Sequence, residues 1–425
     1  MTLPMQHPSD SQTAAQEGLV ALDMISQLLT TSAFDLDRLL TEIVRTTAKR
    51  MRVKASALRM LHEETGELAL TAVYGLSPTF LSEGPVFDTQ SRFQQLIENG
   101  GVLEILDVSR EPDLRFSQAV LAEGIASLLA VGLYQDDKII GALSVYTDAP
   151  QHFSDPAVRT LRVIANQASV AVQLARLHQA EMEKDQLEWE LTLAGEIQAG
   201  VLPKQMPAFG GMRIAGWSEP WQQVGGDFYD FIELPEGNLG IVIGDVSGKG
   251  IPAALLMFTV RMAVRAHVEH EYALREIMRR VSRALYRDTQ PEQFATLFYG
   301  VLNLPNRVFT YVNASHNPPL IFRGDQVLSL EVGGLPVGLL PDLRYEEAAV
   351  QLLPGDLLVF YTDGYTDIAG ENNEFFGEER LRRCLQQHRH EDPEQIIQAL
   401  EKVATTFIST SDHGDDRTMV VIKVD

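Results

Sequence analysis

The chain has 425 residues, of which 45% are hydrophobic and 22% charged, as expected for a globular protein of two domains and a connector. Its formal net charge of −23 disfavours nucleic acid and anionic membranes as partners, because both require clustered lysine and arginine. Cys384 is the only cysteine, which excludes an intrachain disulfide and a thiolate zinc site.

Residues 1–19 are polar and small, and are predicted to form a flexible tail. They lack the basic region and apolar run of a signal peptide, and no later stretch approaches the ~18 uninterrupted apolar residues of a membrane span. We therefore expect a cytoplasmic protein that does not bind membranes.

Residues 20–175 are predicted to form an α+β domain that begins with helix, because its first apolar residues recur at spacings of three and four. The stretch ASALRMLHEETGELALTAVYGL predicts a β-hairpin, and ASLLAVGLYQDDKIIGALSVYT predicts a second one that turns at Asp136 and Asp137. Between them, RFQQLIENGG predicts a short helix that ends at Gly100 and Gly101.

A long helix is predicted from residue 155 to 202, since proline is absent between Pro156 and Pro203. Its apolar residues follow a heptad stripe, with two polar seam positions: Val170, Leu177, Leu187, Leu191, Ala194 and Val201, then Lys184 and Gln198. Such a stripe indicates a parallel coiled coil in a homodimer. The alternative is an amphipathic helix packed on its own domain. Residues 176–204 are assigned as the helical linker.

Residues 205–425 are predicted to form a domain of antiparallel strands and covering helices. Six short runs predict strands: LGIVIGDV, FATLFYGVLNL, RVFTYVNAS, PLIFRG, DLLVFYTDG and RTMVVIKVD. Two helical stretches separate them, starting at IPAALLMF and at EERLRRC. The strands follow one another in hairpin order instead of alternating with helices, which favours antiparallel sheets covered by helices.

The stretch GGDFYDFIELPEGNLGIVIGDVSGKG, residues 225–250, is rich in glycine but fits no nucleotide-binding pattern. A P-loop needs glycine where Ile243 stands and a hydroxyl residue where Gly250 stands. Its remaining glycines have the wrong spacing for a dinucleotide fingerprint. The diguanylate cyclase signature continues Gly-Gly-Asp with Glu-Phe, whereas this chain continues with Phe-Tyr.

Aspartates at the ends of predicted strands indicate a different chemistry. They are Asp245, Asp363, Asp415 and Asp416, and Asp227 joins them because it follows Gly225 and Gly226 in the glycine-rich stretch. Clustered carboxylates repel one another unless cations neutralise them, and all-oxygen ligands favour Mg²⁺ or Mn²⁺ over Zn²⁺. Each aspartate alone is also compatible with a turn or a helix cap, so spacing by itself indicates a candidate divalent-metal site and no more.

Motifs over residues 190–425 resemble the SpoIIE/RsbU-like branch of the metal-dependent type-2C (PPM) serine/threonine protein phosphatases. They are, in order, LAGEIQAGVLP, GGDFYDF, GDVSGKGIPAAL, NASHNPPLIFR, GLPVGLLP, PGDLLVFYTDGYTD, EFFGEERL and DDRTMVV. The resemblance implies that residues 205–425 form an antiparallel β-sandwich flanked by helices. It implies hydrolysis of phosphoserine or phosphothreonine with two divalent cations, Mn²⁺ or Mg²⁺. It also implies a phosphorylated regulatory protein of the anti-anti-sigma (STAS) type as substrate.

The same resemblance implies a set of metal ligands and catalytic residues. Asp245 would bridge both cations, with the Val246 carbonyl as a backbone ligand. Asp363 would bind one cation and Asp415 would complete the same side, while Asp227 would lie at the second cation.

Several neighbouring residues are less well determined by the resemblance. Asp416 is the less favoured ligand of its adjacent pair, Gly364 forms a turn, and Lys249 is either a phosphate contact or a solvated lysine. Ser247 stands where animal type-2C enzymes carry a histidine proposed as general acid, which leaves the proton donor open. We expect His316 to have a structural role.

Residues 20–175 resemble a GAF sensor domain in their order of helix, hairpin, short helices, hairpin and exit helix, and in the runs FDLDRLLTEIV and IIGALSVY. This resemblance implies either a small-molecule ligand or a structural role in dimerisation. The chain as a whole is thus expected to be a sensor phosphatase. The alternatives are a non-catalytic signalling adaptor with a decayed phosphatase domain and a small-molecule phosphoesterase.

Overall fold

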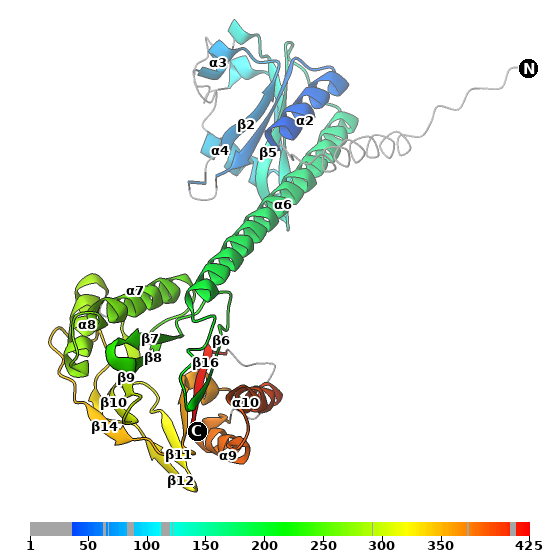
Figure 1. Cartoon of the computed structure of the whole chain (residues 1–425). Helices are drawn as coiled ribbons and strands as arrows, with labels where there is room; N and C mark the ends of the chain where they lie inside the picture. The colour runs from blue at the N-terminus through cyan, green and yellow to red at the C-terminus, as the bar shows by residue number, and fades with distance from the viewer. Residues whose placement is uncertain are drawn as a thin grey trace, which may run out of the picture. The chain divides into compact units, whose positions relative to one another are not determined.

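The computed structural model describes residues 36–62, 65–66, 68–82, 89–111, 120, 122–290, 292–371, 374–408 and 414–425. The tail predicted over residues 1–19, and the helix predicted from there to residue 35, lie outside the described residues. The chain divides into two compact units, Met1–Asp185 and Gln186–Asp425. Figure 1 shows the elements of each unit.

The first unit is built on a five-stranded antiparallel sheet with the strand order β2-β1-β5-β4-β3. The strands are β1 (Ala55–Leu61), β2 (Leu68–Tyr74), β3 (Val102–Ile105), β4 (Ser127–Gln135) and β5 (Lys138–Thr147). Both predicted hairpins are confirmed, as β1–β2 and β4–β5. At the tip of the second, Asp136 and Asp137 have φ of 46° and 62°, the backbone conformation of a two-residue hairpin turn.

Helices cover both faces of this sheet. On one face lie α2 (Leu36–Met51) and the first part of α6 (Asp155–Val201). On the other lie α3 (Pro78–Ser82), α4 (Thr89–Glu98) and the short 3₁₀ helix η1 (Val108–Arg110). The predicted helix end is confirmed, because Gly100 and Gly101 follow α4 with φ of 64° and 78°.

The predicted long helix is confirmed as α6, a single helix of 47 residues. Small residues such as Ala165 and Ala168 are fully buried on the sheet of the first unit. Val170 and Leu177 lie on the opposite side of the helix, where they are 50% and 68% exposed. The placement of Gln198 at a coiled-coil seam is wrong, because its side chain is buried and bonded within the second unit.

The second unit contains two sheets. The first has the strand order β13-β10-β9-β8-β7, with β14 paired to β10, and the second has the order β12-β11-β15-β16-β6. The first comprises β7 (Phe228–Leu234), β8 (Asn238–Val246), β9 (Ala295–Asn303), β10 (Val308–Ala314), β13 (Gly333–Gly334) and β14 (Ala348–Gln351). The second comprises β6 (Met212–Glu219), β11 (Leu320–Arg323), β12 (Gln326–Ser329), β15 (Leu357–Tyr361) and β16 (Arg417–Val424). Apart from the short parallel pair β10–β13, the pairings among the described strands are antiparallel.

The two sheets pack face to face, and helices cover their outer faces. Buried side chains from both sheets, among them Ile241, Phe298, Phe360 and Val420, fill the space between them. The helices α7 (Ile251–Val268) and α8 (Leu274–Asp288) cover the first sheet, while α9 (Gly377–His388) and α10 (Pro393–Phe407) cover the second (Figure 1). The predicted β-sandwich flanked by helices is confirmed.

Of the described helices, α7 is the one that is long and apolar enough to cross a membrane, with 18 residues and a mean hydropathy of 1.3. Met257, Val260 and Val264 on this helix are buried in the core formed with the first sheet. Core packing therefore accounts for the apolar residues on the buried face of this helix.

Candidate active site

Four chain segments bring aspartates to the same end of the β-sandwich. Asp245 is the next-to-last residue of β8 and pairs with Thr296 of β9, so it lies inside the strand, which ends at Val246 as the run LGIVIGDV predicts. Asp227 directly precedes β7, and Asp363 begins the 3₁₀ turn η3 (Asp363–Tyr365) after β15. Asp415 lies two residues before β16. Both sheets thus contribute carboxylates.

These carboxyl groups lie close enough together to raise one another's pKa. Burial, followed by the charges of Asp363, Asp415 and Asp416, raises the pKa of Asp245 to about 7. Burial and then Asp415 raise the pKa of Asp363 to about 6. The pKa of Asp227 is raised by burial and then by Asp245 and Asp416. Acidic side chains are therefore concentrated in one region, where their mutual repulsion and burial disfavour the charged forms.

A threonine that the sequence did not single out holds Asp227 in place. Thr362 Oγ1 donates a 2.6 Å hydrogen bond to Asp227 Oδ2 and accepts one of 2.9 Å from the backbone N–H of Thr418. Asp227 is 5% exposed and Thr362 is fully buried. The signal in the sequence was the position of Thr362 directly before Asp363, at the end of the apolar strand.

Asp416 has a different environment from its neighbour Asp415. The Asp416 carboxylate accepts hydrogen bonds from the backbone N–H groups of Trp221 at 2.8 Å and Gly226 at 2.6 Å. It therefore anchors the loop that leads to Asp227. The side chain of Asp415 is 43% exposed, and its Oδ1 accepts a 3.0 Å hydrogen bond from the backbone N–H of the adjacent Asp416.

Lys249 lies at the candidate site and contacts the same acidic segment. Its Nζ is 3.2 Å from Asp415 Oδ2 and donates a 2.7 Å hydrogen bond to the Gly414 carbonyl. These two contacts link the loop after β8 to the segment before β16. The sequence predicted either a phosphate contact or a solvated side chain for Lys249, and neither role includes this bridge.

Two glycines permit close packing around the aspartates. A Cβ on Gly364 would lie 1.9 Å from the Asp416 carbonyl oxygen. A Cβ on Gly226 would lie 2.8 Å from the carbonyl oxygen of Val246, the backbone group predicted as a ligand. Any side chain at either position would push the aspartate-bearing segments apart.

Neither Ser247 nor His316 presents a free proton donor to the site. The Ser247 hydroxyl donates to the Glu292 carbonyl at 3.1 Å and accepts from the Phe294 N–H at 3.0 Å. His316 is 2% exposed, and its Nδ1 is 2.8 Å from Thr296 Oγ1. Burial lowers the pKa of His316 to about 3, so the ring is neutral at physiological pH. This agrees with the structural role expected for His316.

The donor set fits hard divalent cations. It consists of carboxylate oxygens that repel one another and are partly withdrawn from water, so a bound cation would relieve the repulsion. Within the described ranges, no three His, Cys, Asp or Glu side chains already stand in a metal-binding arrangement.

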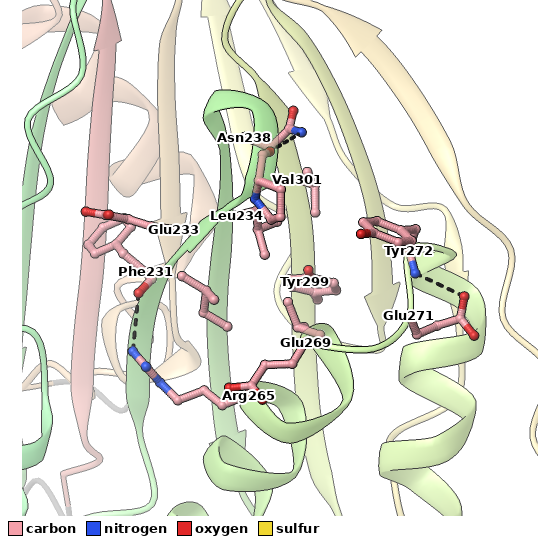
Figure 2. Close-up of a pocket in the computed structure, with 13 residues that line it drawn as sticks. Phe231, Glu233, Leu234, Asn238, Arg265, Glu269, Glu271, Tyr272, Tyr299 and Val301 are labelled. Atoms are coloured by element: carbon pink, nitrogen blue, oxygen red, sulfur yellow. Dashed lines mark hydrogen bonds between the residues drawn. The ribbon is translucent and has the colours of Figure 1, made fainter.

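Two cavities in the second unit differ in their relation to the aspartates. One of about 610 Å³ lies where the C-terminal end of α7 meets the first sheet, and Ile232, Arg265, Tyr272 and Tyr299 are among its lining residues (Figure 2). No aspartate lines it. A second cavity of about 50 Å³ is lined by residues that include Asp227. Only the smaller cavity therefore belongs to the candidate active site.

Comparison with known proteins identifies two domains. Residues 35–172 match the GAF domain, and residues 235–425 match the family of Stage II sporulation protein E (SpoIIE). Phosphoserine phosphatase RsbU of Bacillus subtilis (strain 168) is 27% identical over 244 residues, which cover 56% of this chain and 71% of RsbU. Protein IcfG of Synechocystis sp. is 30% identical over 261 residues, which cover 55% of this chain and 41% of IcfG.

A solved structure supports the fold of the second unit. The SiaA-PP2C domain of Pseudomonas aeruginosa superposes with a TM-score of 0.52 at 23% identity, covering 57% of this chain and 99% of that domain. The expected combination of a GAF domain with a SpoIIE/PP2C-type domain is confirmed.

Proposed function

We propose that this chain, which joins a GAF domain to a SpoIIE/PP2C-type domain, is a metal-dependent protein serine/threonine phosphatase. The observation that carries the proposal is the convergence of Asp227, Asp245, Asp363 and Asp415 from both sheets, with raised pKa values for the first three. The similarity to RsbU, which is named a phosphoserine phosphatase, supports the same reaction.

We assign Asp245, Asp363, Asp415 and Asp227 as the residues that would hold two divalent cations, Mn²⁺ or Mg²⁺, together with the Val246 carbonyl. Such a pair of cations, when bound, supplies an activated water and charge neutralisation for an in-line displacement at phosphorus. This assignment is supported by the acidic, all-oxygen donor set.

The neighbouring residues of the chain would orient these carboxylates. Thr362 holds Asp227 through its hydroxyl, and Lys249 pairs with Asp415. Since Ser247 is bonded to backbone groups and His316 is buried and neutral, we assign protonation of the leaving alkoxide to solvent water.

We further propose a phosphorylated regulatory protein of the anti-anti-sigma (STAS) type as substrate, and a cytoplasmic location. The GAF domain would control the activity, through a small-molecule ligand or through dimerisation. We propose functional boundaries of 20–175 for the sensor, 176–204 for the helical linker and 205–425 for the catalytic domain.

We propose that the active protein is a homodimer joined along α6. Val170, Leu177 and Leu187 are 50%, 68% and 53% exposed, although they are apolar and follow the heptad stripe. Size measurement of the full chain and of its Leu177→Lys variant tests this proposal. A full chain that is monomeric at micromolar concentration would exclude it.

Hydrolysis of a phosphoserine protein, with Mn²⁺ and after chelation, tests the catalytic proposal. We expect chelation, Asp245→Ala and Asp363→Ala each to abolish hydrolysis. Asp325→Ala is the matched control, because that side chain is 97% exposed, and it should retain full activity. Activity that survives chelation or either site variant would refute the metal mechanism.

A further inference from the structure

Gln198, near the end of α6, makes an unusual pair of hydrogen bonds within the second unit. Its Nε2 donates to the Gly225 carbonyl at 2.6 Å, and its Oε1 accepts from the Gly225 N–H at 3.0 Å. One side-chain amide thus satisfies both backbone polar groups of a single residue. The side chain is 5% exposed, so water does not compete for either bond.

The backbone of α6 also lies directly against the same loop. A Cβ on Gly195 would come within 2.3 Å of the Gln223 carbonyl oxygen, so this contact requires glycine. The cavity of about 50 Å³ beside it is lined by both Gln198 and Asp227. Gln198 and a candidate metal ligand, Asp227, therefore border the same small cavity.

Gly225 is two residues from Asp227, and the residue between them is held from the other side. The Gly226 N–H donates to Asp416 Oδ2 at 2.6 Å, and a Cβ on Gly225 would meet the same carboxylate oxygen at 2.3 Å. The loop before Asp227 thus lies between the amide of Gln198 and the carboxylate of Asp416.

We propose that Gln198 is a positioning residue for the candidate metal site, which sets the backbone before Asp227 so that its carboxylate can share a cation with Asp245. This inference rests on the proposed function. A role in packing alone would be served by any unbranched side chain of the same length. Only an amide offers a donor and an acceptor at the spacing of the Gly225 backbone groups.

Two variants separate hydrogen bonding from packing. Gln198→Met keeps the length of the side chain and removes both bonds. Gln198→Glu keeps its shape and the acceptor for the Gly225 N–H, but an ionised carboxylate cannot donate to the Gly225 carbonyl and is repelled by it. Gln186→Met is the control, because Gln186 lies on the exposed part of the same helix and bonds only to Glu190 among the described residues.

The primary measurement is the Mn²⁺ dissociation constant of the full-length protein, obtained by calorimetric titration alongside a melting curve. We expect both Gln198 variants to bind Mn²⁺ about 10-fold to 100-fold more weakly, as found for other residues that orient metal ligands. The phosphatase kcat of both variants should recover at saturating Mn²⁺. Gln186→Met should bind as wild type does.

The result that would overturn the inference is wild-type Mn²⁺ affinity in Gln198→Met, or in Gln198→Glu if the first variant melts too low to titrate. A kcat that stays low at saturating Mn²⁺ would also overturn it, because the defect would then not lie in metal positioning. If wild-type protein itself binds no Mn²⁺, the proposed function fails instead.

Discussion

Thr362 Oγ1 donates a 2.6 Å hydrogen bond to Asp227 Oδ2 and thereby joins two motifs that lie 135 positions apart in the chain. The same oxygen accepts a hydrogen bond from the Thr418 N–H at the start of β16. One buried hydroxyl therefore links the segments that carry Asp227, Asp363 and Asp415. Its removal should affect both stability and metal binding.

Replacement of Thr362 by valine keeps the shape of the side chain but leaves the Thr418 N–H and Asp227 without this partner. We expect the free energy of unfolding to fall by about 1–3 kcal/mol, because a buried polar group loses its hydrogen bond. Mn²⁺ affinity should fall about 10-fold or more. Chemical denaturation and calorimetric titration measure the two effects.

Thr406→Val is the control for this experiment. Thr406 bonds only to the Lys402 carbonyl on the exposed side of α10 among the described residues, so both quantities should stay near wild type. Equal stability of the Thr362 and Thr406 variants would show that the bond to Asp227 contributes nothing.

The raised pKa of Asp363 predicts that the stability of the metal-free protein falls as the pH rises. Burial and Asp415 raise this pKa from 3.8 to about 6, so the folded state binds the proton more tightly than the unfolded state does. The resulting stabilisation is complete below about pH 4 and is lost as the pH rises through 6. In the absence of metal at pH 8, the melting temperature of Asp363→Asn should therefore be about 2–4 °C higher than that of wild type.

This advantage of Asp363→Asn should shrink as the pH falls from 8 to 5, because wild-type Asp363 then becomes protonated and neutral. The same variant should bind Mn²⁺ poorly, and added Mn²⁺ should raise the melting temperature of wild type only. Melting curves at four pH values, with and without chelator, provide the measurement. If Asp363→Asn melts above wild type by the same amount at every pH, or melts below it, ionised Asp363 does not destabilise the metal-free protein.

The elements that the sequence predicted well are those with local signals. The β4–β5 hairpin has continuous apolar strands and a two-aspartate turn, and α6 has 47 residues with no proline after its first turn. The edge strand β6 was missed, because it pairs only with β16 and its residues alternate irregularly between buried and exposed. β7 was also missed, because Asp230 and Glu233 interrupt its apolar residues.

In the candidate site, too, the residues with a local sequence signal were predicted and those defined by contacts between distant segments were not. Asp245, Asp363, Asp415 and Asp416 could be found because each adjoins a predicted apolar strand, and Asp227 could be found because it follows two glycines in a recognisable motif. Gln198 could not, since helical periodicity assigned it to a dimer seam, whereas its actual partner is the backbone of Gly225, 27 positions later. Side-chain bonds to a loop backbone depend on how two segments meet in space, and no repeat in the sequence records this.

Asp230, within the β7 stretch, should be a major stabilising residue of the second unit. It is 1% exposed and accepts hydrogen bonds from Arg265 Nε at 2.6 Å and Nη2 at 2.8 Å, while Arg261 Nε lies 3.0 Å away. Both arginines belong to α7, so the carboxylate ties this helix to β7. Asp230→Asn would leave two partly buried guanidinium groups uncompensated, and we expect a loss of about 3–5 kcal/mol in unfolding free energy.

An exposed ion pair provides the comparison for Asp230→Asn. Glu379 pairs with Arg383 at 2.8 Å on the surface of α9, and both side chains are more than half exposed. Glu379→Gln should change the stability by no more than about 0.5 kcal/mol. If urea denaturation gives similar midpoints for the two variants, the buried pair does not hold α7 in place.

Glycine should be required at position 364 because there is no space for a side chain, and not because of its backbone conformation. A Cβ there would lie 1.9 Å from the Asp416 carbonyl oxygen, whereas the φ of Gly364 lies outside the left-handed region that favours glycine. Gly364→Ala must therefore displace Asp363 or the Asp415–Asp416 segment, with an expected cost of about 1–3 kcal/mol and a marked loss of Mn²⁺ affinity. Gly210→Ala is the matched control, because no atom lies within 4 Å of its Cβ position. Calorimetric titration and melting curves of both variants decide the matter, and wild-type Mn²⁺ binding by Gly364→Ala would show that the two acidic segments need not pack this closely.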